Sequence, residues 1–198
     1  MTIVYILDLP YCLNIDENQP VIHIAVANKL GIFKPVTLYH NNNMISIHTE
    51  ATIGHVLNVL QPNKARDYDS KIIVLLISGK LESITEERIL NDENLAIIGD
   101  EIIQFTNAKL LELGKYELSH LIRGKIGTEN QISTHKSGDR FILLDQKLKK
   151  VSIPKHLLDI ICEYKVLAPG QTLADAKSFY FTWKGNSLKS AICNQCFL

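Results

Sequence analysis

A short stretch in the middle of the chain decides the fold: Leu95-Ala96-Ile97-Ile98-Gly99-Asp100-Glu101-Ile102-Ile103-Gln104-Phe105. It holds two apolar runs rich in β-branched residues, and only Gly99-Asp100 separates them. Such a pair is typical of a two-residue hairpin turn. The stretch therefore predicts two antiparallel strands, residues 95–98 and 101–105.

The same pattern of short β-branched runs closed by turn residues continues on both sides. Residues 109–112 and 116–121 are expected to meet across Leu113-Gly114-Lys115, which makes a β-meander. Residues 36–40 and 44–48 flank Asn41-Asn42-Asn43, and asparagine tolerates the positive φ of a hairpin turn. Further strands are expected at residues 2–9, 21–26, 71–78, 141–144 and 178–183. Turns about every eight to twelve residues predict an all-β, mainly antiparallel protein, a sandwich plus a barrel-like subdomain.

Helical signals are few. Ser83-Ile84-Thr85-Glu86 and Thr128-Glu129-Asn130-Gln131 both have the spacing of a capping box, in which two side chains satisfy each other's backbone amides. The first predicts a short helix over residues 85–90, and the second allows another. We therefore expect one or two short helices.

The most polar segment, residues 61–70, is typical of a loop or a domain boundary. We expect a sandwich-like subdomain at residues 1–69 and a barrel-like subdomain at residues 70–155. Residues 156–198 are expected to supply C-terminal strands that pack back on the first subdomain and to end in a frayed tail.

Composition excludes some classes of protein. The 198 residues include 21 basic and 21 acidic side chains, so the net charge is zero. A dedicated nucleic-acid binder needs a basic excess, and this class is therefore excluded. The longest apolar run, residues 72–77, is far shorter than the roughly twenty residues that span a membrane. The N-terminus has no basic region and is interrupted by Asp8 and Pro10, which predicts no secretory signal and a cytoplasmic protein.

No spacing suggests a nucleophile with a base and an orienting group, so enzymatic activity is not expected. The adjacent carboxylates Glu86-Glu87 and Asp100-Glu101 are interpreted as a solvated surface, because neighbouring side chains point to different faces.

Four residues could form a zinc site. Cys193 and Cys196 have the spacing of half such a site, and Cys162 with His156 could complete it. A single pair at a chain terminus favours free thiols on a frayed tail instead. We therefore expect no metal and no cofactor.

Three ordered segments resemble a known family: residues 94–105, residues 118–129 and residues 135–145. Their order and spacing are similar to the C-terminal region of the large tail-tip protein of gene transfer agents and related siphophage-like tails of alphaproteobacteria. That protein is often called the host-specificity or baseplate hub protein. The similarity touches most of the chain, from about residue 5 to residue 188.

Within these segments we single out eight residues as a structural motif. The fork of Arg123 could clamp carbonyls or a carboxylate such as Glu129 or Asp145. The glycines at 124 and 127 bracket a turn that needs positive φ or close backbone approach, and the threonine at 128 can cap the next turn. A structural clasp between hairpins is favoured over a ligand or receptor contact. The motif comprises Arg123, Gly124, Gly127, Thr128, Glu129, His135, Gly138 and Asp145.

The resemblance implies a non-enzymatic structural or host-recognition module of the distal tail, whose partners are other tail or baseplate proteins or a cell-surface receptor. Family members are longer, with hub domains upstream, so we expect a remnant of a longer tail gene. Because such hubs are trimeric, loss of the hub could leave this chain monomeric. It would lie in the cytoplasm or in a phage-like tail particle.

A carbohydrate-binding β-module that recognises a cell-surface glycan is the alternative. Exposed aromatic rings would be its stacking platforms, although core packing explains most of these residues equally well. The candidates are Tyr39, Tyr68, Tyr116, Tyr180 and Trp183.

Overall fold

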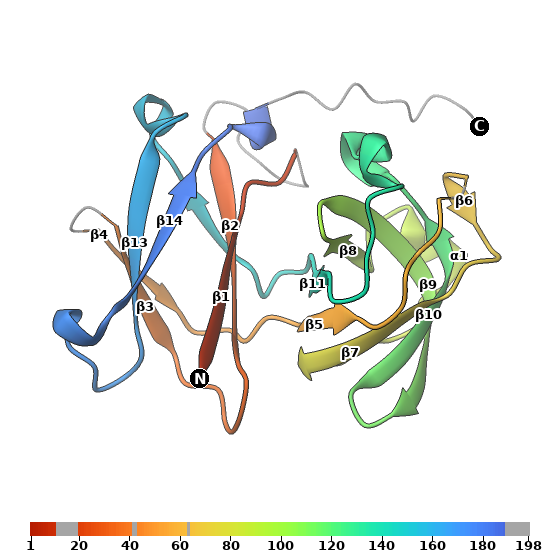
Figure 1. Ribbon diagram of the computed structural model, residues 1–198, viewed down its shortest axis with the longest axis horizontal. Coiled ribbons are helices and arrows are strands. Elements are labelled where there is room, and N and C mark those ends of the chain that lie inside the picture. The colour runs from red at the N-terminus through yellow and green to blue at the C-terminus, as the bar shows by residue number, and fades with distance from the viewer. Residues whose placement is uncertain (11–19, 41–42, 63, 189–198) are drawn as a thin grey trace. The chain divides into compact units, whose positions relative to one another are not determined.

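The strands form three antiparallel sheets in the computed structural model (Figure 1). The structure describes residues 1–10, 20–40, 43–62 and 64–188. The chain divides into two compact units, unit 1 (Met1–Glu50 and the described part of Leu148–Ala191) and unit 2 (Ala51–Lys147). The prediction of an all-β protein with few helices is confirmed.

Unit 1 is a sandwich of two sheets. The first has the order β1-β2-β12, and the second has the order β14-β13-β3-β4. The seven strands are β1 (Thr2–Leu7), β2 (Val21–Asn28), β3 (Val36–His40), β4 (Asn43–Ile47), β12 (Lys149–Ser152), β13 (Ile161–Leu167) and β14 (Lys177–Thr182). Apolar side chains of both sheets share one core, which includes Ile24, Leu38, Tyr164 and Trp183. Alternate residues face this core because successive side chains of a strand point to opposite faces.

Unit 2 is a closed barrel. Antiparallel pairing runs β10-β7-β5-β11-β8-β9, and β9 pairs in turn with β10, which closes the ring. The short strand β6 adds to β10 outside the ring. The strands are β5 (Ile53–Val56), β6 (Arg66–Asp67), β7 (Ile72–Ser78), β8 (Leu95–Ile98), β9 (Glu101–Glu112), β10 (Lys115–Ile122) and β11 (Arg140–Leu143). Closure leaves the six ring strands without a free edge, and their inward side chains, such as Val74, Phe105 and Phe141, form one core.

The hairpin predicted from residues 95–105 is present. Leu95 to Ile98 pair with Gln104 to Glu101 across Gly99-Asp100, and Gly99 has φ 57°. The next prediction was incomplete, because residues 101–112 form one long strand rather than two runs. Pairing with β10 carries the strand through the polar residues at positions 106 and 107.

The unit boundaries fall after residues 50 and 147, whereas the sequence placed them after residues 69 and 155. The strand at 53–56 pairs with β7 and β11 and so belongs to the barrel. The polar segment at 61–70 is a loop of the barrel that contains β6, and residues 149–152 pair with β2 in unit 1.

The helical segments are short. They are α1 (Glu86–Ile89) and the 3-10 turns η1 (Lys125–Gly127), η2 (Glu129–Gln131), η3 (Lys155–Leu157), η4 (Leu173–Asp175) and η5 (Asn186–Leu188). None of the helices among the described residues is long and apolar enough to span a membrane.

The predicted capping boxes do not form. Ser83 Oγ accepts the backbone N–H of Ala108 at 3.0 Å, and Thr128 Oγ1 accepts that of Ile102 at 2.9 Å. Both hydroxyls tie a turn to β9 instead of capping a helix. The capping box that does form joins Thr172 and Asp175 at η4.

Candidate functional site

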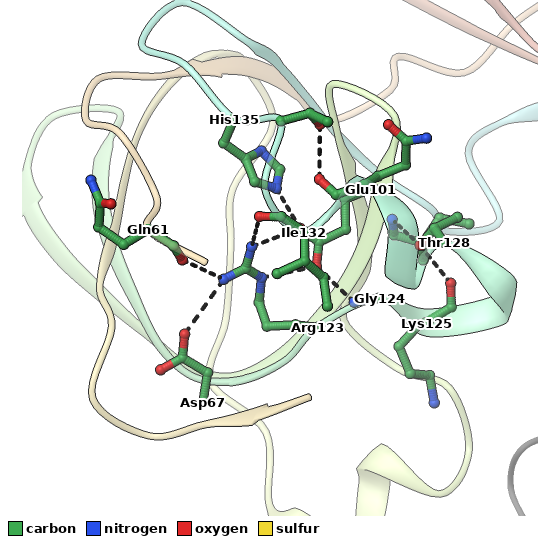
Figure 2. Close-up of polar contacts among 12 residues, drawn as sticks. Gln61, Asp67, Glu101, Arg123, Gly124, Lys125, Thr128, Ile132 and His135 are labelled. Atoms are coloured by element: carbon green, nitrogen blue, oxygen red, sulfur yellow. Dashed lines mark hydrogen bonds and ion pairs between the residues drawn. The ribbon is translucent and has the colours of Figure 1, made fainter. Parts of the chain in front are cut away.

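The candidate site is a buried charged cluster in unit 2, centred on Arg123 directly after β10 (Figure 2). The residue is 1% exposed, and its backbone N–H donates to the Ala65 carbonyl at 2.7 Å. We call the cluster the Arg123 clasp and define it as Arg123 with Gln61, Asp67, Glu101, Gly124, Ile132 and His135.

Arg123 and Glu101 form a bidentate ion pair. Arg123 Nε donates to Glu101 Oε1 and Nη2 donates to Oε2, both at 2.8 Å. Glu101 is the first residue of β9 and is fully buried. The parallel pair of hydrogen bonds matches the planar fork of the guanidinium to the carboxylate, the geometry of the strongest charge-assisted contacts.

The remaining N–H groups of Arg123 hold two loops. Nη1 donates to the Gln61 carbonyl at 3.3 Å and lies 3.5 Å from Asp67 Oδ2, and Nη2 donates to the Ile132 carbonyl at 3.1 Å. Since a guanidinium has five N–H groups, every one of them has an acceptor within the protein. Arg123 therefore joins the loop before β7, the start of β9 and the segment before β11.

Glu101 is saturated as well. Its carboxylate accepts the backbone N–H of Gly124 at 2.7 Å and a hydrogen bond from His135 Nε2, besides the two from Arg123. The His135 side chain is buried, and its Nδ1 lies 3.7 Å from Asp139 Oδ2. Because a carboxylate oxygen only accepts hydrogen bonds, this contact requires a proton on Nε2 of His135.

The environment keeps Glu101 ionised. Burial by itself would raise the pKa of Glu101, but hydrogen bonds from His135, Arg123 and the Gly124 amide, together with the Arg123 charge, hold that pKa below its ordinary value. A buried carboxylate is tolerated when paired in this way, and removing its partner leaves an uncompensated charge.

The turn after Arg123 depends on a glycine. Gly124 has φ 62°, and a Cβ there would lie 2.8 Å from the Glu129 Cα. Thr128 is buried, and its hydroxyl bridges the Ile102 N–H and the Lys125 carbonyl. The turn therefore presents the Gly124 amide to Glu101 while it stays tied to β9.

The structure brings together only part of the predicted motif. Arg123, Gly124 and His135 meet in the clasp, and Thr128 supports it from β9. Gly127 and Gly138 have positive φ with open space around the missing Cβ.

The carboxylates proposed for Arg123 are not its partners. Glu129 is exposed, and Asp145 accepts the Lys147 backbone N–H at 3.0 Å. Burial raises the pKa of Asp145.

Sequence reasoning missed both acidic partners. Glu101 was assigned with Asp100 to a solvated surface, which is wrong for Glu101 because that residue is fully buried. Asp67 lies in the polar segment read as a loop, yet it is buried, and its Oδ1 accepts the backbone N–H groups of Asp69 and Ser70. The available signal was the apolar sequence on both sides of Glu101, which is unusual for an exposed acid.

In the described part of the chain, no group of three or more histidine, cysteine or acidic side chains has an arrangement that could hold a metal ion. Cys193 and Cys196 of the predicted half-site lie outside the described residues. Cys162 is buried in unit 1, and burial raises the pKa of its thiol. The contacts of the clasp position loops and contain no nucleophile.

Comparison with known proteins gives a family match that lies in unit 2. No curated protein matches the chain. Residues 51–142 match the model of the family described as Rcc01698-like, C-terminal. All residues of the Arg123 clasp, from Gln61 to His135, therefore lie inside the segment that is similar to this family.

Proposed function

We propose that this protein is a non-enzymatic structural or host-recognition module of a phage-like tail, related to the C-terminal region of the tail-tip hub of gene transfer agents. The family match at residues 51–142 supports the proposal. It covers most of the three segments, residues 94–105, 118–129 and 135–145, that carry the sequence resemblance.

The proposal that the module is non-enzymatic depends on one observation: every N–H group of the Arg123 guanidinium has an acceptor within the protein. An arginine that stabilises a transition state keeps donors directed at the reacting group. Here the donors of Arg123 are used by Glu101, Asp67 and two carbonyls. This arrangement favours a residue that holds the barrel loops in place.

Particle fractionation tests this proposal. The tagged full chain is expressed in cells that produce phage-like particles and in matched cells that lack the tail genes, and both lysates are separated on density gradients. We expect the chain to sediment with tails only in the producing cells. A chain that stays at the top of both gradients would contradict a role in the tail.

The oligomeric state is a second readout. We expect the purified 198-residue chain to be a monomer by light scattering. A stable trimer would show that these residues are sufficient for self-assembly.

A glycan-binding module is the second candidate, and one exposed tyrosine favours it. Tyr116 and Trp183 are buried and belong to the cores, whereas Tyr180 on β14 is 69% exposed. Its hydroxyl donates to Glu163 Oε1 at 3.4 Å, and Ser178 Oγ donates to the same oxygen at 2.7 Å. An exposed ring beside a positioned carboxylate can stack on a sugar and accept its hydroxyl groups.

Glycan-array binding separates the two candidates. If the β13–β14 face binds sugars, Tyr180→Ala abolishes array binding, while the matched change Tyr68→Ala at the exposed tyrosine of unit 2 preserves it. Absence of binding by the unaltered protein would contradict the glycan-binding candidate.

A further inference from the structure

We propose that the turn between β2 and β3, residues 29–35, is a lipid-contacting tip that inserts into membranes containing anionic phospholipid. We call it the β2–β3 tip. The inference deepens the host-recognition part of the proposed function, because it names the partner surface. It rests on the side chains of unit 1 and not on the Arg123 clasp.

Two large apolar side chains stand out into solvent at this tip. Leu30 is 81% exposed and Ile32 is 89% exposed, with Gly31 between them at φ 82°. Positive φ at Gly31 lets the chain reverse between the two side chains. Phe33 turns the other way and packs against the core of unit 1.

The tip is fixed by hydrogen bonds, so the exposure of Leu30 and Ile32 is a property of the folded turn. Asn28 Nδ2 donates to the Ile32 carbonyl at 3.0 Å. The backbone N–H of Asn28 donates to Glu50 Oε1 at 3.0 Å, and that of Lys29 to the Met1 carbonyl at 2.9 Å. A turn held in this way at its β2 end presents its apolar residues at a reduced ordering cost on binding.

Lysines flank the apolar pair. Lys29 and Lys34 are exposed, and within the described residues neither forms an ion pair. The β9–β10 turn makes a useful contrast, because Leu113 is 99% exposed there but Lys115, two residues further on, is paired with Glu112 at 3.0 Å. Of these two turns, the β2–β3 tip is the one where exposed apolar side chains lie beside lysines that form no ion pair within the described residues.

This chemistry fits an anionic bilayer better than a protein surface. A stable protein interface takes about 800 Å² from each partner, far more than two side chains of one turn supply. A bilayer instead accepts single apolar side chains, and the strength of attachment scales with the apolar area inserted and with attraction to anionic headgroups. Basic residues near such a surface strengthen binding by about fivefold each.

Vesicle co-sedimentation of the purified full chain tests the proposal. The vesicles are phosphatidylcholine alone or phosphatidylcholine mixed with phosphatidylglycerol. We expect binding to the mixed vesicles that weakens at raised salt and is much lower on the neutral ones. Leu30→Ser with Ile32→Ser should weaken binding at least about tenfold, and Lys29→Gln with Lys34→Gln by more than about tenfold.

Leu113→Ser is the matched control, since it removes an exposed leucine at another turn. It should bind like the unaltered protein, and thermal melts should be the same for all variants because each altered side chain is exposed. As a second readout, Leu30→Trp should give a blue-shifted emission on mixed vesicles, against the constant signal of buried Trp183.

Three results would overturn the proposal: no binding of the unaltered chain to mixed vesicles, full binding by the Leu30/Ile32 variant, or loss confined to Leu113→Ser. These assays contain no tail proteins, so a negative result would not contradict the proposed role in the tail. The density-gradient experiment tests that role separately.

Discussion

Arg123 and Glu101 meet side by side in the interior of the barrel, with both guanidinium-to-carboxylate hydrogen bonds at 2.8 Å. Twenty-two positions separate the two residues, and β10 carries Arg123 back to the start of β9. Buried ion pairs add little net stability compared with apolar packing, but they strongly penalise any arrangement that separates the charges. The pair therefore specifies which loops close this part of the barrel.

Arg123→Ala should destabilise unit 2 by about 3 to 5 kcal/mol, because Glu101 is left as a buried unpaired carboxylate. We expect a fall in melting temperature of roughly ten degrees or more by calorimetry. Arg88→Ala is the control, since it breaks the exposed pair with Glu93 and should leave the melt unchanged. Equal effects of the two substitutions would count against the clasp.

Acid should weaken unit 2 through Glu101. The pKa of Glu101 in the folded protein is below its ordinary value, so the unfolded chain takes up this proton first as pH falls. The stabilisation is therefore complete above about pH 4.3 and is lost below it. Hydrogen exchange of β9 and β10 peptides should accelerate in this range. In Glu101→Gln the protection is lower throughout, and its acid dependence should be smaller; an unchanged acid dependence would exclude Glu101 as the source.

Unit 1 should begin to lose stability at a higher pH than unit 2 does, because of His23. Burial, reinforced by the charge of Lys150, lowers the pKa of His23 to about 4. An ordinary histidine has a pKa near 6.5, so between about pH 6.5 and 4 the unfolded state binds a proton that the folded state does not bind. The free energy of unfolding of unit 1 therefore falls by about 3 kcal/mol in total as pH decreases from about 6.5 toward 4. Fluorescence of Trp183, the only tryptophan, reports urea unfolding of this unit. His23→Phe should remove the dependence, and its persistence would assign the effect elsewhere.

Gly124→Ala should destabilise unit 2 more than Gly127→Ala. Both glycines have positive φ, but a Cβ at Gly124 would meet the Glu129 backbone at 2.8 Å, whereas the space at Gly127 is open. The strain of a left-handed alanine costs about 1 to 2 kcal/mol at either site, and the clash adds to it only at Gly124. Denaturant midpoints of the two variants measure the difference, and equal midpoints would mean that the close approach relaxes freely.

Local sequence predicted the hairpins well, because a turn such as Gly99-Asp100 dictates both the reversal and the pairing of its strands. It failed where long-range pairing decides. The expected strands at 101–105 and 109–112 are one strand, because pairing with β10 continues through residues 106–108. Residues 61–70 suggested a loop or a domain boundary, and they are a loop of the barrel whose strand β6 pairs with β10.

The basic part of the candidate site could be predicted from the sequence, but its acidic part could not. The sequence favoured Arg123 and Gly124 as part of a structural clasp, because a guanidinium fork can hold several oxygen atoms and a glycine allows the turn that follows. Its acidic partners could not be identified, since the distance of Asp67 and Glu101 from Arg123 along the chain gives no indication that barrel closure brings them together. The two carboxylates named instead have other surroundings: Glu129 is exposed, and Asp145, which is as far from Arg123 along the chain as Glu101 is, accepts the Lys147 backbone N–H.

The central claim is that the Arg123–Glu101 pair holds the barrel loops together, and a double-mutant cycle tests it most directly. The free energy of unfolding of unit 2 is measured for the unaltered protein, Arg123→Met, Glu101→Leu and the double variant. The clasp predicts that each single change costs several kcal/mol, roughly 3 to 5, and that the double change costs no more than either alone, because no buried charge of the pair is left unpaired. Small and additive effects would contradict the claim that this pair holds the barrel loops together.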